Sequence, residues 1–357
     1  KFIMAYTTIN KSTDYFNTKL WTGTGSNGNA ISGVGFAPDL VWVKNRSGTY
    51  DHVLFDRVRG DNKHVESNNN SAEENEAYTL AFGSDGYSVG TNTLNNSGSN
   101  IVGWNWRAGT TGSGTTTGSG TGKAYSYSVN TTAGFSIVKY KGNGTTGHTI
   151  PHHLGVAPAM FIIKRLDSAV SWYVYHHKAS YSGSASNDTE LYLDTTDRAY
   201  ANSKWNATSP TSTVFTINNS TAVNGNDNDY IAYCFAEKTG YSKFGSYTGN
   251  GNADGTFVYT GFKPSFYMVK QTNTSGEGWF MWDNKRSSAG GANENDRYLV
   301  ANNNSADGTL GVDCDFLSNG VKTRYGSSAT NSSGGTYIYM AFGQSLVGSN
   351  NVPCTAR

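Results

Sequence analysis

The sequence predicts an all-β protein made of three tandem β-sandwich domains, and three observations lead to this prediction. Glycine accounts for 43 of the 357 residues and charged residues for only 15 %, whereas about 25 % of an average soluble protein is charged. Aromatic residues reach 13 % and stand in short runs between turn-forming residues, which favours strands over helices. One set of motifs also occurs three times along the chain.

The repeated motif is an aromatic residue before Gly-x-Gly, then Gly-x-x-Pro, then a short apolar run that ends in lysine. Because the copies lie about a hundred residues apart, each has the size of a domain rather than of a solenoid repeat. The three copies are Trp21-Thr-Gly-Thr-Gly25, Gly35-Phe-Ala-Pro38 and Val41-Trp-Val-Lys44; Tyr140-Lys-Gly-Asn-Gly144, Gly155-Val-Ala-Pro158 and Phe161-Ile-Ile-Lys164; and Tyr247-Thr-Gly-Asn-Gly251, Gly261-Phe-Lys-Pro264 and Tyr267-Met-Val-Lys270.

Two more aromatic runs follow in each copy, and both are predicted strands because they are short, rich in β-branched and aromatic residues, and bounded by turn formers. The best helix candidate is the capping-box pattern Ser71-Ala-Glu-Glu74. The predicted strands are His52-Val-Leu-Phe-Asp56, Trp172-Tyr-Val-Tyr-His176 and Trp279-Phe-Met-Trp-Asp283, followed by Ile101-Val-Gly-Trp-Asn-Trp106, Tyr230-Ile-Ala-Tyr-Cys-Phe235 and Tyr337-Ile-Tyr-Met-Ala-Phe342.

The repeats and a run of Gly, Ser and Thr define the expected domain boundaries. Because that run has the composition of a flexible linker, we expect the first sandwich to move independently, and the second and third to pack rigidly against each other. The expected divisions are an N-terminal segment 1–13, sandwiches at 14–109, 125–239 and 240–344, the linker 110–124 and a C-terminal tail 345–357.

Charge and cysteine content exclude several classes of function. The net charge of +1 comes from 27 basic and 26 acidic residues, so electrostatic capture of nucleic acid or of an anionic membrane is not expected. No apolar run reaches the ~20 residues of a membrane span. The three cysteines lack the spacing of a zinc site. We therefore expect Cys234 and Cys314 to be buried as small apolar residues, and Cys354 to be exposed.

Several of these motifs resemble a repeat-domain family of marine bacteriophages, which occurs in tail-fibre-like and other virion structural proteins. The resemblance covers essentially the whole chain and implies lectin-like, jelly-roll-like domains on the virion surface, with no catalytic residues and no cofactor. The motifs that carry it are Asp14-Tyr-Phe-Asn-Thr-Lys-Leu-Trp21-Thr-Gly-Thr-Gly25, Gly35-Phe-Ala-Pro-Asp-Leu-Val-Trp-Val-Lys44, Phe55-Asp-Arg-Val-Arg-Gly60, Ala133-Gly-Phe-Ser-Ile-Val138 and Phe244-Gly-Ser-Tyr-Thr-Gly-Asn-Gly251.

Clusters of titratable residues give weaker indications of chemistry. Adjacent histidines on a strand point to opposite faces, so we expect solvated histidines and no metal site. The Asn/Asp-rich loops lack the spacing of a calcium loop and are explained as well by turn formation. Two pairs of nearby acids carry no other mark of a glycosidase. The clusters are His148, His152, His153, His176 and His177; Asn224-Gly-Asn-Asp-Asn-Asp229 and Gly251-Asn-Ala-Asp-Gly255; and Asp51 with Asp56 and Asp313 with Asp315.

Aromatic rings are the expected binding groups, because sugar rings stack on aromatic faces while amides and carboxylates bond the hydroxyls. The candidate ligand-binding residues are Trp172, Trp205, Trp279 and Trp282. Alternation along the strand places Trp279 and Trp282 on opposite faces, so at least one of the two belongs to the core.

These observations together predict a non-catalytic, tail-fibre-like virion protein that displays sandwich domains for recognition of a host-surface glycan. The expected partners are other virion proteins, further copies of the chain, preferably as a trimer, and a cell-surface glycan. The alternatives are a capsid decoration or collar protein without a receptor, a bacterial lectin or adhesin of phage origin, and a glycan depolymerase.

Overall fold

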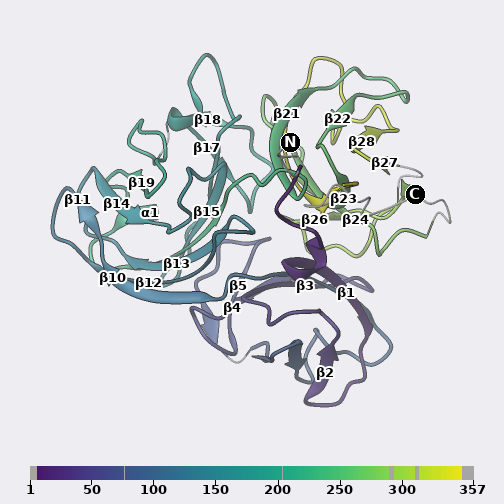
Figure 1. Cartoon of the computed structure of the whole chain (residues 1–357), viewed down its shortest axis with the longest axis horizontal. Coiled ribbons are helices and arrows are strands. Elements are labelled where there is room, and N and C mark those ends of the chain that lie inside the picture. The colour runs from purple at the N-terminus through teal and green to yellow at the C-terminus, as the bar shows by residue number, and fades with distance from the viewer. Residues whose placement is uncertain (1–5, 76, 203, 289–292, 310–312, 348–357) are drawn as a thin grey trace, which may run out of the picture.

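Nearly all regular structure in the computed structural model is β-strand (Figure 1), as the sequence predicts. The structure describes residues 6–75, 77–202, 204–288, 293–309 and 313–347. In these ranges the helical segments are short: η1 (Ser12–Asp14), η2 (Ser186–Asp188) and α1 (Thr221–Asn224). The capping-box pattern Ser71-Ala-Glu-Glu74 forms no helix, because Glu74 begins a two-residue strand instead.

Each of the three repeated segments contributes one large antiparallel sheet, and the same strand order recurs. In each sheet the last strand of the segment lies between the strand before Gly-x-Gly and the strand after Gly-x-x-Pro. The first sheet has the order β1 (Phe16–Thr22), β9 (Asn100–Trp106), β3 (Leu40–Asn45), β4 (His52–Asp56), β5 (Lys63–Glu66) and β6 (Glu74–Asn75). The second has the order β10 (Thr110–Thr115), β12 (Ala124–Asn130), β13 (Phe135–Lys141), β20 (Asp229–Phe235), β15 (Met160–Arg165), β16 (Tyr173–His176), β17 (Thr189–Tyr192) and β18 (Tyr200–Ala201). The third has the order β21 (Ser242–Thr248), β29 (Thr336–Gln344), β23 (Lys263–Gln271), β24 (Trp279–Asp283) and β26 (Leu299–Val300).

A smaller sheet packs on one face of each large sheet, and a cluster of buried apolar side chains fills the space between the two, which gives a sandwich-like arrangement. The small sheets are β2 (Asn29–Ser32), β8 (Gly86–Val89) and β7 (Leu80–Phe82); β11 (Thr117–Gly118), β14 (His148–Pro151) and β19 (Val214–Ile217); and β22 (Phe257–Tyr259), β28 (Gly320–Thr323), β27 (Cys314–Leu317) and β25 (Glu294–Asn295).

The segment 110–124, which we expected to be a linker, is largely strand. β10 pairs along its whole length with β12, and Gly112 and Gly114 stand directly opposite Tyr127 and Tyr125. Because glycine has no side chain, the tyrosine rings can lie against the strand backbone, a cross-strand pairing that stabilises glycine in a sheet. The Gly, Ser and Thr residues of this segment, although typical of a flexible linker, therefore form an edge strand that aromatic rings cover.

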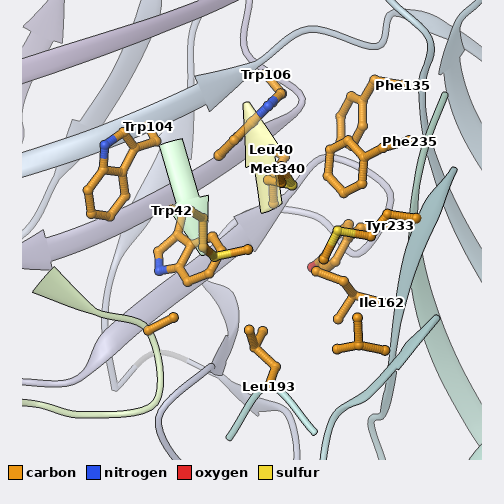
Figure 2. Close-up of a cluster of buried hydrophobic side chains, with 14 of the residues drawn as sticks. Leu40, Trp42, Trp104, Trp106, Phe135, Ile162, Leu193, Tyr233, Phe235 and Met340 are labelled. Atoms are coloured by element: carbon orange, nitrogen blue, oxygen red, sulfur yellow. The ribbon is translucent and has the colours of Figure 1, made fainter. Parts of the chain in front are cut away.

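The opposite faces of the three large sheets meet in one central core (Figure 2). Alternate residues of a strand divide between the two cores, as the period of two requires: Trp104 and Trp106 of β9 lie in the central core, whereas Ile101 lies inside the first sandwich. Figure 2 shows Trp104, Trp106 and Leu40 together with Phe135, Phe235 and Tyr233 of the second segment. The first segment is therefore packed against the others rather than separated from them.

Contacts between the segments follow a cycle, in which the central strand of the second segment bonds to the first segment, that of the first to the third, and that of the third to the second. The central strand donates in the first two contacts and accepts in the last. The central strand of each segment bonds to the end of β4, β16 or β24 in its neighbour. Tyr233 Oη donates to Asp56 Oδ2 at 2.8 Å, Trp104 Nε1 donates to Asp283 Oδ2 at 2.9 Å, and His176 Nε2 donates to the Tyr339 carbonyl at 3.1 Å.

A second cycle of bonds joins the loops that follow β5, β17 and β26. In each loop, the side chain of an Asn or Asp accepts a hydrogen bond from the backbone N–H that begins one of the predicted strands. Two positions later in the loop, a backbone carbonyl accepts a hydrogen bond from the neighbouring segment. The loop acceptors are Asn68, Asp194 and Asn302 for His52, Trp172 and Trp279. The bonds between segments run from Lys164 Nζ to the Asn70 carbonyl, from Gly276 N to the Thr196 carbonyl and from Tyr50 N to the Asn304 carbonyl. The described residues thus form a closed, approximately threefold arrangement.

Candidate functional site

The four tryptophans expected to bind a ligand lie in the interior, with at most 1 % of each side chain exposed. Each indole N–H is bonded inside the protein. Trp172 donates to the Glu66 carbonyl at 2.9 Å, Trp205 to the Thr189 carbonyl at 3.0 Å, Trp279 to the Tyr192 carbonyl at 2.8 Å and Trp282 to Asp313 Oδ2 at 3.0 Å. A ring in this position offers no face to a sugar in solution, so a binding surface must be sought elsewhere.

Three of the five clustered histidines are buried rather than solvated, which corrects our expectation. His148 contacts Asn224 Oδ1 at 2.9 Å and Thr116 Oγ1 at 2.7 Å, and His152 contacts the Thr211 carbonyl at 3.1 Å. Burial lowers the pKa of His152 to about 4 and that of His176 to about 3. The residues that the structure describes contain no group of three His, Cys, Asp or Glu side chains placed to hold a metal ion.

The acidic candidates are held by neighbours of opposite charge or by hydrogen-bond donors. In the Asn/Asp-rich loops, Asp227 pairs with Lys123 at 2.5 Å and Asp254 with Lys322 at 2.8 Å. Of the suspected acid pairs, Asp56 bonds Arg59 and Asp315 bonds Arg324, while Asp51 accepts from Asn68 and Asp313 accepts from Trp282. Burial raises the pKa of Asp313 to about 6. Each acid named here therefore has a partner within the protein.

The lysine at the end of each repeated motif is also structural. Lys44, Lys164 and Lys270 are fully buried, and each donates to backbone carbonyls in or beside the loop before β4, β16 or β24, including Gly48, Val170 and Glu277. Burial lowers the pKa of all three to about 8. The repetition of this lysine therefore reflects a loop anchor present in every segment.

A groove of about 410 Å³ on the second segment presents partly exposed aromatic rings instead, and we call it the tyrosine groove. Tyr173 of β16 and Tyr192 of β17 are cross-strand partners, and their rings meet edge to face at 5.1 Å. The Tyr200 ring of β18 lies 5.9 Å from that of Tyr192. The groove is lined by Ser171, Tyr173, Glu190, Tyr192, Thr195, Asp197, Tyr200, Ala201 and Asn202.

A charged network fixes the floor of the tyrosine groove. Glu190 is 1 % exposed and accepts bonds from Tyr192 Oη at 2.9 Å and Lys204 Nζ at 3.3 Å. Burial raises the pKa of Glu190, and the Lys204 ammonium acts in the opposite direction. Lys204 Nζ also lies 5.4 Å from the ring centroid of Tyr173, so one cation holds both the buried acid and a ring of the groove.

Two acids line the tyrosine groove, and two cations outside the lining lie against its rings. Glu190 and Asp197 supply two carboxylates, Lys204 pairs with Glu190, and the Arg198 guanidinium lies 5.1 Å from the ring centroid of Tyr200. A site without net charge and with aromatic rings beside hydroxyl, amide and carboxylate groups suits a neutral, hydroxyl-rich ligand better than an ionic one.

The sequence indicates the tryptophans of these strands as binding groups and does not indicate the tyrosines beside them. The alternation in Trp172-Tyr-Val-Tyr-His176 does carry a signal, because burial of Trp172 and Val174 in the central core places Tyr173 on the other face. Tyr192 and Tyr200 reach the same place only through the pairing of β16, β17 and β18. The sequence does not reveal that pairing.

Comparison with known proteins places the chain in a family without assigning it an activity. No curated protein and no solved structure matches it, and no helix in the described ranges is long and apolar enough to cross a bilayer. The model of one protein family, described as Domain of unknown function (DUF7483), matches residues 11–345. Since this match covers nearly the whole chain, the protein belongs to the DUF7483 family.

Proposed function

We propose that this chain is a non-catalytic virion structural protein, tail-fibre-like, that recognises a neutral glycan on the host surface through the tyrosine groove. The observation that carries the recognition part is the set of three partly exposed tyrosine rings around a charge-balanced groove with Thr195, Asp197 and Asn202 at its polar positions. The virion part rests on the sequence resemblance described above.

The groove also indicates which sugars suit it. Edge-to-face and adjacent rings such as Tyr173, Tyr192 and Tyr200 give several flat apolar surfaces, and β-linked glucose, N-acetylglucosamine or mannose offers flat C–H faces that pack against them. Sulfated or uronic-acid glycans bring charge that the balanced groove does not compensate. We therefore propose a neutral, β-linked glycan as the ligand class.

Calorimetric titration with neutral oligosaccharides tests the recognition proposal. The probes are β-1,4-glucan, β-1,4-N-acetylglucosamine, β-1,4-mannan and β-1,3-glucan oligomers of two, four and six sugars, with alginate oligomers as the anionic comparison. At least one neutral series should bind, and Tyr200→Ala should weaken binding about tenfold, corresponding to ~1.4 kcal/mol. Tyr259→Ala, which removes an exposed tyrosine of β22, is the matched control and should leave binding unchanged. Binding by none of the neutral series would refute the proposal.

The same probes separate recognition from cleavage. A depolymerase would release new reducing ends from the series that binds, whereas a non-catalytic protein leaves the oligomers intact after long incubation. Release of reducing ends that stops in the Glu190→Gln variant would show that the groove is an active site.

The position on the particle tests the virion part separately. Gold-labelled antibody against this chain should mark the distal tail of phage particles in electron micrographs. Grains spread over the capsid would instead identify a decoration protein, and a particle without grains would favour a bacterial lectin or adhesin of phage origin.

A further inference from the structure

A second groove lies on the third segment beside the tyrosine groove, and we call it the phenylalanine groove. It has a volume of about 350 Å³. The rings of Phe280 and Tyr298 meet there at 5.3 Å, and Asn302 and Asn303 bring amide groups to its wall. Both rings are partly exposed, so this groove again combines aromatic surface with polar side chains.

The two grooves occupy the same position in the repeated strand order. Tyr173 of β16 pairs with Tyr192 of β17, and Phe280 of β24 pairs with Val300 of β26. Each ring follows a tryptophan whose backbone N–H is held by the next loop, at Asp194 Oδ1 and at Asn302 Oδ1. The phenylalanine groove is thus the counterpart of the tyrosine groove in the next segment.

One loop forms a wall of both grooves. Thr195 and Asp197 line the tyrosine groove, and Thr196 lines the phenylalanine groove. Since consecutive Cα atoms are ~3.8 Å apart, the two grooves are separated at this wall by little more than the thickness of the chain.

The loop is also tied to the third segment, which fixes the spacing of the grooves. The Gly276 N–H donates to the Thr196 carbonyl at 2.9 Å, the Ala199 N–H to the Thr272 carbonyl at 2.9 Å, and the Arg198 N–H to Ser275 Oγ at 3.1 Å. A ligand that touches both grooves meets a preformed surface, which lowers the entropy cost of binding.

The first segment has no counterpart of these rings. Val53 stands at the corresponding position of β4, is fully buried, and pairs with Glu66 of β5. Aromatic side chains therefore occur at this position only in the two segments that share the loop at 194–199.

We infer that the two grooves are subsites of one binding tract, and that the ligand is an extended neutral oligosaccharide that crosses the loop at Thr196. This inference rests on the proposed function and adds to it the length of the ligand. A disaccharide can fill one groove only, whereas a longer chain contacts both at once and gains affinity from each.

Affinity measured against chain length tests the inference, with the two-, four- and six-sugar members of the neutral series that binds. The hexamer should bind at least tenfold more tightly than the dimer, with one hexamer per chain. Phe280→Ala and, separately, Tyr298→Ala should reduce the hexamer affinity about tenfold and leave the dimer affinity unchanged. Phe257→Ala, which removes an exposed phenylalanine of β22, serves as the control for both.

The outcomes distinguish this inference from the proposed function. The single tract would be refuted if the hexamer binds no better than the dimer, or if two hexamers bind per chain. It would also be refuted if neither Phe280→Ala nor Tyr298→Ala changes the hexamer affinity. In each of these cases the tyrosine groove would still be a glycan site. Binding by no member of any neutral series would overturn both. Unchanged thermal unfolding of the variants shows that a loss of affinity comes from the groove.

Discussion

Asp56 and Arg59 form an ion pair from which solvent is fully excluded, with both side chains 0 % exposed and Nε 2.5 Å from Oδ2. Arg59 Nη2 also donates to the Leu54 carbonyl at 2.9 Å. The third segment repeats the pair as Asp283 and Arg286 at 2.6 Å. Burial acts to lower the pKa of Arg59, but the nearby Asp56 carboxylate acts in the opposite direction, and the pKa of Arg59 is raised overall. The guanidinium therefore stays charged in the core.

Removing one partner of this pair should be costly. Asp56→Ala removes the nearest counter-charge of the buried Arg59 and leaves it only Glu73, at 3.4 Å. It also removes the acceptor of Tyr233 Oη, so we expect the free energy of unfolding to fall by ~3–5 kcal/mol. The control is Asp229→Ala, which removes a partner of Lys141 at the surface, where a change below ~1 kcal/mol is expected. Urea unfolding of both variants checks this, and equal losses would contradict the role given to burial.

Buried histidines should make the protein sensitive to acid. The pKa of His176 is lowered to about 3 and that of His152 to about 4 by burial, and that of His52 lies well below its ordinary value because of burial and the Lys44 charge. The unfolded chain binds protons below pH ~6.5 while the folded chain does not, so stability present above pH ~6.5 is lost as the pH falls toward 4.

The slope of stability against pH measures this effect, at up to ~1.4 kcal/mol per pH unit for each such histidine. His176→Asn should reduce the slope between pH 6 and 4, whereas His153→Asn, at a partly exposed ring, should change it less. An unchanged slope in the His176→Asn variant would contradict the burial of this ring in its neutral form.

At the scale of the element, the β10–β12 pair depends on glycines placed opposite rings. A Cβ on Gly112 would lie 2.6 Å from Tyr127 Oη, and one on Gly114 would lie 2.8 Å from Tyr125 Oη. Tyr127 in turn stacks on His153 with ring centroids 3.7 Å apart. A side chain on β10 would therefore displace rings that belong to the second sandwich.

Gly112→Val should destabilise the protein by ~1–3 kcal/mol, the cost of forcing a side chain into an occupied site. Thr111→Val, at the neighbouring exposed position of the same strand, changes the side chain away from these rings and should cost little. Thermal unfolding of the two variants checks the difference. If Gly112→Val is neutral or stabilising, the ring does not cover the strand as described.

Strands were the most predictable elements. The predicted runs at 52–56, 172–176 and 279–283 contain β4, β16 and β24, because a short run between turn formers has few alternatives. The edge strand β10 was not predictable, since Gly, Ser and Thr are typical of a linker and only the facing Tyr125 and Tyr127 make the segment a strand.

At the scale of the whole molecule, the central core joins the three large sheets. Antiparallel sheets usually keep one face in water, whereas here each covers a sandwich core with one face and the central core with the other. This arrangement explains why Trp172 and Trp279 are buried although they stand at the ends of strands. Their location could not be predicted from the sequence, because it depends on the neighbouring segment rather than on the strand itself.

Unfolding of the whole chain should be a single cooperative transition. Each segment keeps its own sandwich core, but loss of one segment would expose the apolar faces that the large sheets of the other two turn toward the central core. This exposure makes partial unfolding costly. Calorimetry should give one peak whose van't Hoff and calorimetric enthalpies agree. Two or three resolved transitions would show that the segments are stable alone.

The central core also bears on assembly. We expected a trimer because a thin, glycine-rich domain gains stability by association, but the described segments already supply one another with these contacts. We now predict a monomer of 38.3 kDa in light scattering at micromolar concentration. A mass three times larger would support the original expectation of a trimer.

The closed cycle of contacts within one chain has a consequence for variation. In a ring of three identical subunits every substitution is made three times, so a change that suits one interface is imposed on all of them. Here the residues of each interface are encoded separately, and the central contacts differ. The first and third segments carry an Asp–Arg pair, whereas the second carries His176 and Ala179 at the same positions. The same freedom lets aromatic rings accumulate on two segments while the first keeps Val53. Three segments of similar strand order within one chain thus allow an approximately symmetric scaffold to carry an asymmetric surface.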